Sequence, residues 1–462
     1  MLLYTQREFK NNVLPSRNQG LSGRATYDYD QRYLFEFNFG YNGTERLGKG
    51  DRFEFFPAVS LGWLVSNEKF FEPLSDVVSS LKLRGSYGLV GSDETGPSNA
   101  PHFLYIDQVQ VTGNGRPGFT TGENLNVSYY GPVVQQWAVQ NGGWERVKKL
   151  DVGFDMELFR ELSITFDFFY DKRYNILLHR EAWPQSLGFH EAKPWSNKGK
   201  VDNWGYEVST NWRKQFTKDL TVDFRGTFTY TQNKYIDVDE PIYPYVWQTA
   251  TGKPLNRRNG YIAEGLFQSQ EEIDNSPTQN LGSKPMPGDI KYRDVDGNGV
   301  IDSKDQVMIS KTANMPRIQY GFGVNIDWKR FNFGVFFNGS AMRDININGL
   351  HPFGQNDYNA MKFVAENRWT EANPNPNAEY PRLGLNDSQM SNNSQSSTYW
   401  IRNGNFLRFK TLEIGYRFDH VRLYFTGNNL AVFSPFKLWD PELGWNSYPL
   451  QRTFCIGAQL SF

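Results

Sequence analysis

The chain of 462 residues carries 49 lysines and arginines against 50 aspartates and glutamates, which leaves a formal net charge of −1. This balance gives no electrostatic reason to expect a nucleic acid as partner. The single cysteine, Cys455, excludes an internal disulfide framework. No run approaches the roughly 18 apolar residues of a membrane helix, and the opening MLLYTQREFKNNVLPSRN lacks the apolar segment of a signal peptide. For an exported protein, we therefore expect this chain to be mature, truncated or a fragment.

Segments in which apolar and polar residues alternate recur from one end of the chain to the other. In residues 33–41, for example, Phe35 and Phe37 fall on one face of an extended chain while Glu36 and Asn38 fall on the other. Such a period of two predicts β-strands with one apolar face. Roughly twelve strands are predicted in this way, at 33–41, 53–65, 81–89, 150–158, 162–170, 204–212, 220–230, 318–328, 331–339, 406–418, 421–427 and 453–462.

The connections between these segments alternate between long and short. Long connections occupy about 92–147, 175–199, 235–315, 341–399 and 431–450, whereas short ones fall near 160, 215–218, 330 and 419, with one of moderate length at 66–79. A transmembrane antiparallel β-barrel has long extracellular loops and short periplasmic turns in this order. In a Greek-key sandwich, the connections have no reason to alternate between long and short. The sequence therefore predicts an all-β outer-membrane barrel, in which the last segment, TFCIGAQLSF, has the length of a tilted crossing strand, roughly 9–11 residues.

The sharpest local motif is DVDGNGVIDSKD at 294–305, inside the long connection 235–315. Its spacing follows the ligand order of an EF-hand calcium loop, with Gly299 at the tight turn and Asp in place of the usual Glu at the last position. The predicted ligands are Asp294, Asp296, Asn298, the carbonyl of Val300, Asp302 and Asp305. This set of oxygen donors favours a structural Ca²⁺, with Mg²⁺ as the alternative metal. An acidic turn held by side-chain-to-backbone hydrogen bonds is the competing interpretation.

Motifs for catalysis or nucleotide binding find little support. GTERLGKG at 43–50 has Gly50 where a phosphate-binding loop needs Ser or Thr, and GNGRPG at 113–118 is not followed by a helix-forming sequence. The five histidines are scattered, at His102, His179, His190, His351 and His420. Carboxylates such as Asp155, Glu157, Asp167, Glu207 and Glu413 are what a polar barrel interior requires. We therefore predict that the protein is not an enzyme.

The long connections are rich in aromatic residues. These are Trp137, Trp183, Trp195, Tyr243, Tyr245, Trp247 and Trp400. Aromatic faces beside amide side chains suit sugar rings or extended peptides. Packed loops and membrane interfaces also need aromatic anchors. The sequence leaves both interpretations open.

Several stretches in order along the chain resemble a known family. They include DQRYLFEFNFGYNGTERL (30–47), FFPAVSLGWLVSNEKFF (55–71), LKLRGSYGLVGSD (81–93), PGDIKYRDVDGNGVIDSKDQVMI (287–309), STYWIRNGNFLRFKTLEIGYRF (397–418) and YPLQRTFCIGAQLSF (448–462). Together they resemble the C-terminal half of a SusC/RagA-type TonB-dependent outer-membrane transporter of Bacteroidetes. The final Phe462 is similar to the terminal aromatic residue that the barrel-assembly machinery reads.

This resemblance implies import of large nutrients, typically oligosaccharides or peptides, across the outer membrane. It implies contact with outer-membrane lipid, a SusD-like lipoprotein as extracellular lid, and TonB acting through an N-terminal plug. Nothing in this chain resembles the plug, the TonB-contacting segment or a signal peptide. Residues 1–462 are therefore expected to be the C-terminal portion of a barrel of about 22 strands. A stand-alone small porin or secretion pore, and a soluble secreted glycan-binding β-protein that holds calcium, are the alternatives.

Overall fold

The computed structural model describes residues 1–10, 15–93, 102–111, 117–139, 142–184, 186, 193–313, 315–348, 360–384, 387–443 and 447–460. His190, His351, Phe462 and most of the GNGRPG stretch lie outside these residues. Among the residues described, no helix has both the length and the apolar character needed to cross a membrane. The chain forms two compact units. The first comprises Met1–Glu207, Gln232–Ile242 and Ala250–Gly252, and the second Val208–Thr231, Tyr243–Thr249 and Lys253–Phe462.

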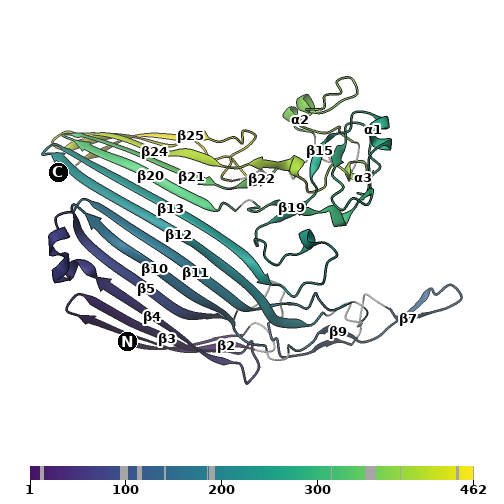
Figure 1. The fold of residues 1–462 in the computed structure, drawn as a ribbon, viewed down its shortest axis with the longest axis horizontal. Coiled ribbons are helices and arrows are strands. Elements are labelled where there is room, and N and C mark those ends of the chain that lie inside the picture. Colours follow the sequence, from purple (N-terminus) through teal and green to yellow (C-terminus); the bar gives the residue numbers. More distant parts are fainter. Residues whose placement is uncertain are drawn as a thin grey trace. The chain divides into compact units, whose positions relative to one another are not determined.

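The first unit is built on long antiparallel strands whose neighbours in sequence are also neighbours in space (Figure 1). The strands are β1 (Leu2–Phe9), β2 (Ser16–Tyr29), β3 (Tyr33–Thr44), β4 (Phe53–Leu64), β5 (Val78–Ser92), β10 (Glu145–Leu158) and β11 (Leu162–His179). β12 (Trp195–Thr217) and β13 (Leu220–Asp237) contribute residues to both units. Two 3₁₀ turns, η1 (Val65–Asn67) and η2 (Lys69–Leu74), connect β4 to β5.

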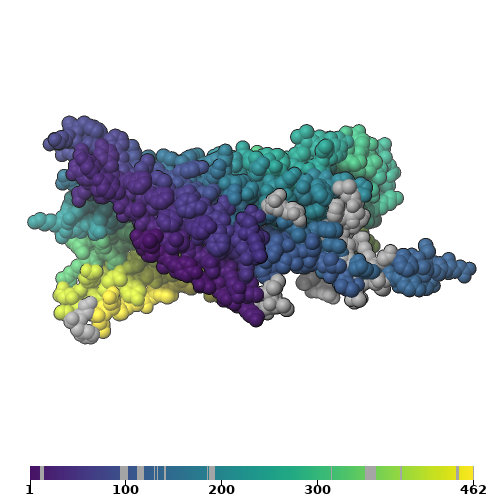
Figure 2. All heavy atoms as spheres, turned by 90° about the horizontal axis from the view of Figure 1, so that it is seen from below, coloured from purple at the N-terminus to yellow at the C-terminus, as the bar shows by residue number. Residues whose placement is uncertain are grey.

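Four short strands lie in the connection between β5 and β10. β6 (Gln108–Gln110) pairs with β9 (Val133–Gln136), and β7 (Pro117–Thr121) pairs with β8 (Val127–Tyr130). Figure 2 shows the β7–β8 ribbon as a narrow projection, coloured blue, that extends away from the strands of its own unit.

The second unit continues the same strand arrangement, with β13 followed by β20 (Ile318–Trp328), β21 (Phe331–Ala341), β24 (Phe406–Arg417), β25 (Val421–Phe433) and β26 (Thr453–Leu460). Its long connections carry small elements of their own. The strands are β14 (Arg258–Gly260), β15 (Ala263–Leu266), β16 (Thr278–Gln279), β17 (Ile290–Tyr292), β18 (Val300–Ile301), β19 (Val307–Ser310), β22 (Asp344–Asn346) and β23 (Ile401–Asn403). The helical turns are η4 (Val246–Gln248), α1 (Gln270–Asp274), η5 (Ser303–Asp305), α2 (Lys362–Asn367), α3 (Asp387–Met390) and η7 (Thr398–Trp400).

All twelve predicted strands are present, and the expected number was two too low. The described residues contain fourteen long strands in this sheet, because β1 and β2 also belong to it. The face of β2 that carries Leu21 and Tyr27 also carries Arg17, Gln19 and Gly23, so the alternation that predicts the other strands is weak there. The connection predicted at 175–199 is shorter than expected. β11 ends at His179 and β12 begins at Trp195, so only the residues between them belong to the connection.

The two faces of the long strands differ in chemistry, as the alternation predicts. Phe35 on β3 lies opposite Leu61 on β4, and these side chains are 41% and 61% exposed. On the other face Arg84 forms ion pairs with Asp155 (3.2 Å) and with Asp167. An exposed band of aromatic and aliphatic side chains on one face and paired charges on the other is the pattern of a strand between lipid and a polar interior.

The connections at the two ends of the strands also differ. Short turns join β2 to β3, β10 to β11, β12 to β13, β20 to β21 and β24 to β25. In the turn between β10 and β11, Phe159 and Arg160 have φ angles of +55° and +57°, and Glu161 N–H donates to Leu158 C=O (3.0 Å). Two successive positive φ angles define a type I′ hairpin turn, which matches the twist of the strands it joins. The long connections all lie at the opposite ends of the strands.

In the second unit the long connections pack around an apolar core of their own. Trp400, Val364, Ile290 and Tyr292 are almost fully buried in it, and α1, α2, α3 and β15 gather in the same region in Figure 1. Polar side chains complete this core: Asn393 Nδ2 donates to Asp289 Oδ1 (2.8 Å), and Trp400 Nε1 donates to the Asn393 carbonyl (2.8 Å). These long connections therefore form one folded body with a common core, and they are not independent loops.

Candidate functional site

The predicted metal loop, residues 294–305, is closed by hydrogen bonds from its own backbone. Gly297 and Gly299 have φ angles of +73° and +85°, a conformation that favours glycine. Their N–H groups donate to the two carboxylate oxygens of Asp294, at 2.8 and 2.7 Å. β18 then pairs in parallel with β16, and η5 ends the loop. The tight turn is what brings the first and last residues of the motif together.

Three of the six predicted ligands converge in this loop. Carboxylate oxygens of Asp294, Asp296 and Asp305 all lie within 4.8 Å of one another. Asp305 is fully buried and accepts hydrogen bonds from the N–H groups of Val295 (2.7 Å) and Asp302 (2.9 Å). A carboxylate has about four lone-pair sites, so this group of oxygens retains acceptor capacity after these bonds. Converging hard oxygen donors of this kind fit a divalent cation such as Ca²⁺.

The other three predicted ligands shape the loop. Asn298 Oδ1 accepts from Val300 N–H (2.8 Å), and Asn298 Nδ2 donates to Asp296 Oδ2 (3.0 Å). Asp302 caps η5 by accepting from Lys304 N–H (2.7 Å). These bonds are also the ones expected of the competing acidic turn. The metal site and the acidic turn therefore have the same loop geometry, and they differ only in whether the loop binds a cation.

Two of the predicted aromatic residues stand beside this loop. Tyr245 and Trp247 stack with ring centroids 4.5 Å apart, and Trp247 Nε1 donates to the Lys304 carbonyl (2.8 Å). A hydrogen bond to the Asp296 carboxylate is the main cause that raises the pKa of the Tyr245 hydroxyl. The phenol and the indole thus contact the loop from one side.

Several of the other predicted residues have structural surroundings. Trp400 is fully buried in the loop core, and Trp195 packs against the His179 ring at 3.6 Å between centroids. These two tryptophans are anchors. Asp155 and Asp167 are engaged by Arg84, and Glu413 forms an ion pair with Arg422.

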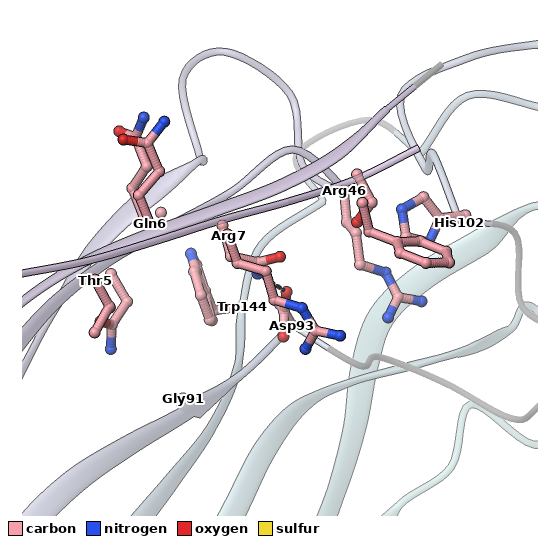
Figure 3. Close-up of a pocket in the computed structure, with 14 residues that line it drawn as sticks. Thr5, Gln6, Arg7, Arg46, Gly91, Asp93, His102 and Trp144 are labelled. Atoms are coloured by element: carbon pink, nitrogen blue, oxygen red, sulfur yellow. Dashed lines mark hydrogen bonds between the residues drawn. The ribbon is translucent and has the colours of Figure 1, made fainter. Parts of the chain in front are cut away.

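A polar cavity of about 620 Å³ lies in the first unit, at the long-connection end of its strands (Figure 3). Its wall comes from β1, β2, β3, β5 and the residues that follow β3 and β5. The labelled lining residues are Thr5, Gln6, Arg7, Arg46, Gly91, Asp93, His102 and Trp144. Arg7 stands opposite Asn18 in the pairing of β1 with β2, so both side chains lie on the polar face.

Three charged side chains, Arg7, Arg46 and Asp93, line this cavity among neutral polar residues. Asp93 is held in place, because its Oδ2 accepts from Asn18 Nδ2 (2.7 Å) and Thr44 Oγ1 (2.8 Å). The buried Nε of Arg46 has no hydrogen-bond partner among the described residues. Burial, followed by the charge of Arg46, lowers the pKa of His102 and outweighs the opposite effects of Asp93 and Glu45. The imidazole is therefore neutral at pH 7.

This cavity was not predicted from the sequence. Its charged residues, Arg7, Arg46, Asp93 and His102, are separated by tens of positions and share no motif. His102 was predicted only as one of five scattered histidines. The pairing of β1 with β2 and β2 with β3 is what brings the residues together, and β1 and β2 are the two strands that the sequence did not predict.

Known proteins with related sequences match nearly the whole chain. No protein-family model matches the chain. The chain is 27% identical over 472 residues to the TonB-dependent receptor SusC of Bacteroides thetaiotaomicron, across 95% of this chain and 43% of that protein. It is 26% identical over 483 residues to the TonB-dependent receptor P3 of Formosa agariphila, across 95% of this chain and 45% of that protein. The chain is homologous to TonB-dependent receptors of the SusC type.

The solved structures agree on the fold. The RagAB peptide transporter structure superimposes with a TM-score of 0.71 at 20% identity, covering 98% of this chain and 48% of the other. The predicted transmembrane antiparallel barrel fold is thereby confirmed. TonB-dependent receptors are outer-membrane barrel proteins and not enzymes, so the outer-membrane location and the non-enzymatic character of this SusC-type homologue are confirmed as well. The chain spans less than half the length of these curated relatives.

Proposed function

We propose that this SusC-type homologue is part of a TonB-dependent importer that takes up oligosaccharides or peptides through the outer membrane. The observation that carries the proposal is the similarity to TonB-dependent receptors over 95% of the chain. In this proposal the chain supplies part of the barrel wall and the long extracellular connections. A SusD-like lipoprotein covers the extracellular mouth, and TonB acts through a part of the receptor beyond these residues.

The chemistry of the strands supports a role in the wall. Aromatic and aliphatic side chains are exposed on one face, where lipid would cover them, while ion pairs such as Arg84 with Asp155 line the other. The packed core of the long connections supports a role for those loops as a preformed rim. A rigid rim binds a lid with a smaller loss of conformational entropy than mobile loops would.

Uptake by cells tests this function. The complete receptor gene would be deleted in its native bacterium and restored on a plasmid, and entry of fluorescently labelled oligosaccharides and peptides would be measured. We expect uptake of one cargo class to need both the receptor and TonB. Uptake that persists when TonB is inactivated would instead favour the stand-alone pore. Purification of the receptor in mild detergent with its lipoprotein lid tests the partner.

We also propose that the loop at 294–305 binds a structural Ca²⁺. The convergence of the Asp294, Asp296 and Asp305 carboxylates supports this proposal. Because Tyr245 and Trp247 stand beside the loop, Tb³⁺ bound in place of Ca²⁺ should show sensitised luminescence. The Asp296→Asn variant should lose this signal, whereas Asp274→Asn, on the exposed helix α1, should keep it. Chelation should expose the loop to proteases. A receptor that shows no Tb³⁺ signal and no protection by Ca²⁺ or Mg²⁺ would favour the acidic turn without a metal.

A further inference from the structure

The polar cavity of the first unit differs from the rest of that unit in how its arginines are paired. Elsewhere on these strands, Arg17 pairs with Glu8 (3.1 Å) and Arg24 with Glu36 (2.6 Å). In the described part of the chain, neither Arg7 nor Arg46 forms an ion pair, and both line the cavity. Two guanidinium groups without a carboxylate partner in one cavity leave a local excess of hydrogen-bond donors.

The cavity contains one carboxylate, and that group is already engaged. Asn18 and Thr44 both donate to Asp93 Oδ2, so Asp93 is held against β2 and β3. Arg46 has a buried Nε with no partner among the described residues. A buried donor without a partner has lost its hydration without gaining a hydrogen bond in return, which is unfavourable. An anionic ligand atom would satisfy it.

Neutral donors complete the lining. The Asn18 carboxamide and the Thr5 hydroxyl lie on the same face as Arg7, and His102 stands beside Arg46 (Figure 3). The guanidinium group presents a planar fork of N–H donors that matches a carboxylate bidentately. The volume of about 620 Å³ is sufficient for a sugar or amino-acid unit rather than an inorganic ion alone.

We propose that this cavity is a subsite for a carboxylate group of the imported cargo, bound by Arg7 and Arg46. The inference rests on the proposed import function and names the chemistry of the cargo: an acidic oligosaccharide or a peptide with a free carboxyl end. The position of the cavity on the polar face, at the end of the strands where the long connections lie, places it where cargo would enter. Arg46 supplies a partly buried donor, and Arg7 supplies an exposed one on β1.

Binding to the complete receptor, purified in detergent, tests the subsite without requiring transport. The probes are trigalacturonic acid and tetra-alanine, each compared with a neutral partner, the methyl ester of the first and the C-terminal amide of the second. We expect at least one acid to bind about tenfold or more tightly than its neutral partner, because a hydrogen bond between charged groups is stronger than one between neutral groups. Preference for the uronate or for the peptide acid identifies the source of the carboxylate.

Variants localise the effect. Arg7→Gln and Arg46→Gln should each remove most of the preference for the acid, and Arg46→Lys should restore part of it because the charge remains without the fork. Arg17→Gln on β2 removes the same charge outside the cavity and should change nothing. Heat-modifiable migration on gels checks that each variant is folded, and the exposed Arg7 provides a variant with little risk to folding.

Two outcomes would overturn the subsite. One is equal binding of acids and their neutral partners by the unmodified receptor, and the other is a preference that survives both glutamine substitutions in folded protein. Cellular uptake separates this failure from that of the import function. If TonB-dependent uptake continues while binding shows no preference for acids, the subsite is wrong and the function stands. If no cargo enters by way of TonB, the import function itself is wrong.

Discussion

In the second unit, large apolar side chains are exposed on the long strands but buried in the long connections. On the long strands, Ile456 is 86% exposed and Phe331 is 50% exposed, whereas Trp400 in the long connections is 0% exposed. Apolar side chains on the strands can face outward because a lipid bilayer surrounds this part of a transmembrane barrel. The loop residues face inward because water surrounds the connections and the hydrophobic effect drives them into a core. The chain is thus adapted to two solvents, with lipid around the strands and water around the long connections, and the change occurs at the ends of the strands.

The largest expected effect comes from breaking the loop core. Trp400→Ala should destabilise the body of long connections by about 3–5 kcal/mol, because it leaves a cavity and removes the donor to the Asn393 carbonyl. Limited proteolysis of the receptor in membranes should show cleavage within the connections 253–317 and 342–400 while the long strands stay protected. Cleavage that also spreads into the strands would mean that the two regions unfold together.

A charge on the lipid face should have the next largest effect. Val335, in the middle of β21, lies opposite Val324 and Leu412 on the apolar face, so Val335→Arg should cost about 2–4 kcal/mol. Thr426→Arg is the matched control, since Thr426 lies opposite Glu413 on the polar face. Refolding into lipid vesicles as a function of urea measures both. Equal effects of the two substitutions would contradict the assignment of the faces.

A smaller effect is expected at the short-turn end. Phe159→Asn combined with Arg160→Gly places the preferred residues of a type I′ turn at two positions of positive φ. Relief of backbone strain should stabilise the strand pair by about 1 kcal/mol. The urea midpoint in vesicles measures this gain. A lower midpoint would indicate that the Phe159 ring makes a stabilising contact with lipid.

The smallest effect concerns pH. The pKa of His102 lies below its ordinary value of 6.5 in the folded protein, chiefly through burial and then through Arg46. The unfolded chain therefore binds a proton more readily, so local stability should fall as the pH drops below about 6.5 and be fully present above it. Hydrogen exchange of the connection between β5 and β10 should detect this, and His102→Gln should abolish it. His420→Gln, at an exposed turn, is the control and should leave the pH dependence intact.

Prediction from the sequence succeeded wherever the signal was local. A strand between lipid and a polar interior must alternate residue by residue, so β3 to β5, β10 to β13, β20, β21 and β24 to β26 could be predicted directly. The turn of the acidic loop was also local, because Gly299 and the three aspartates lie within twelve residues. β1 and β2 were missed because the face of β2 that carries Leu21 and Tyr27 also carries Gln19 and Gly23, and β1 mixes apolar and polar residues on both of its faces.

The sequence by itself determined the strands, the faces of those strands and the alternation of short and long connections. A period of two and the position of turn residues are properties of neighbouring amino acids, and they need no knowledge of the rest of the chain. Only the tertiary structure decided that Trp400 is an anchor and that Arg7, Arg46 and His102 share a cavity. Those relations depend on contacts between residues far apart in sequence, which form only when strand pairing and loop packing bring the segments together.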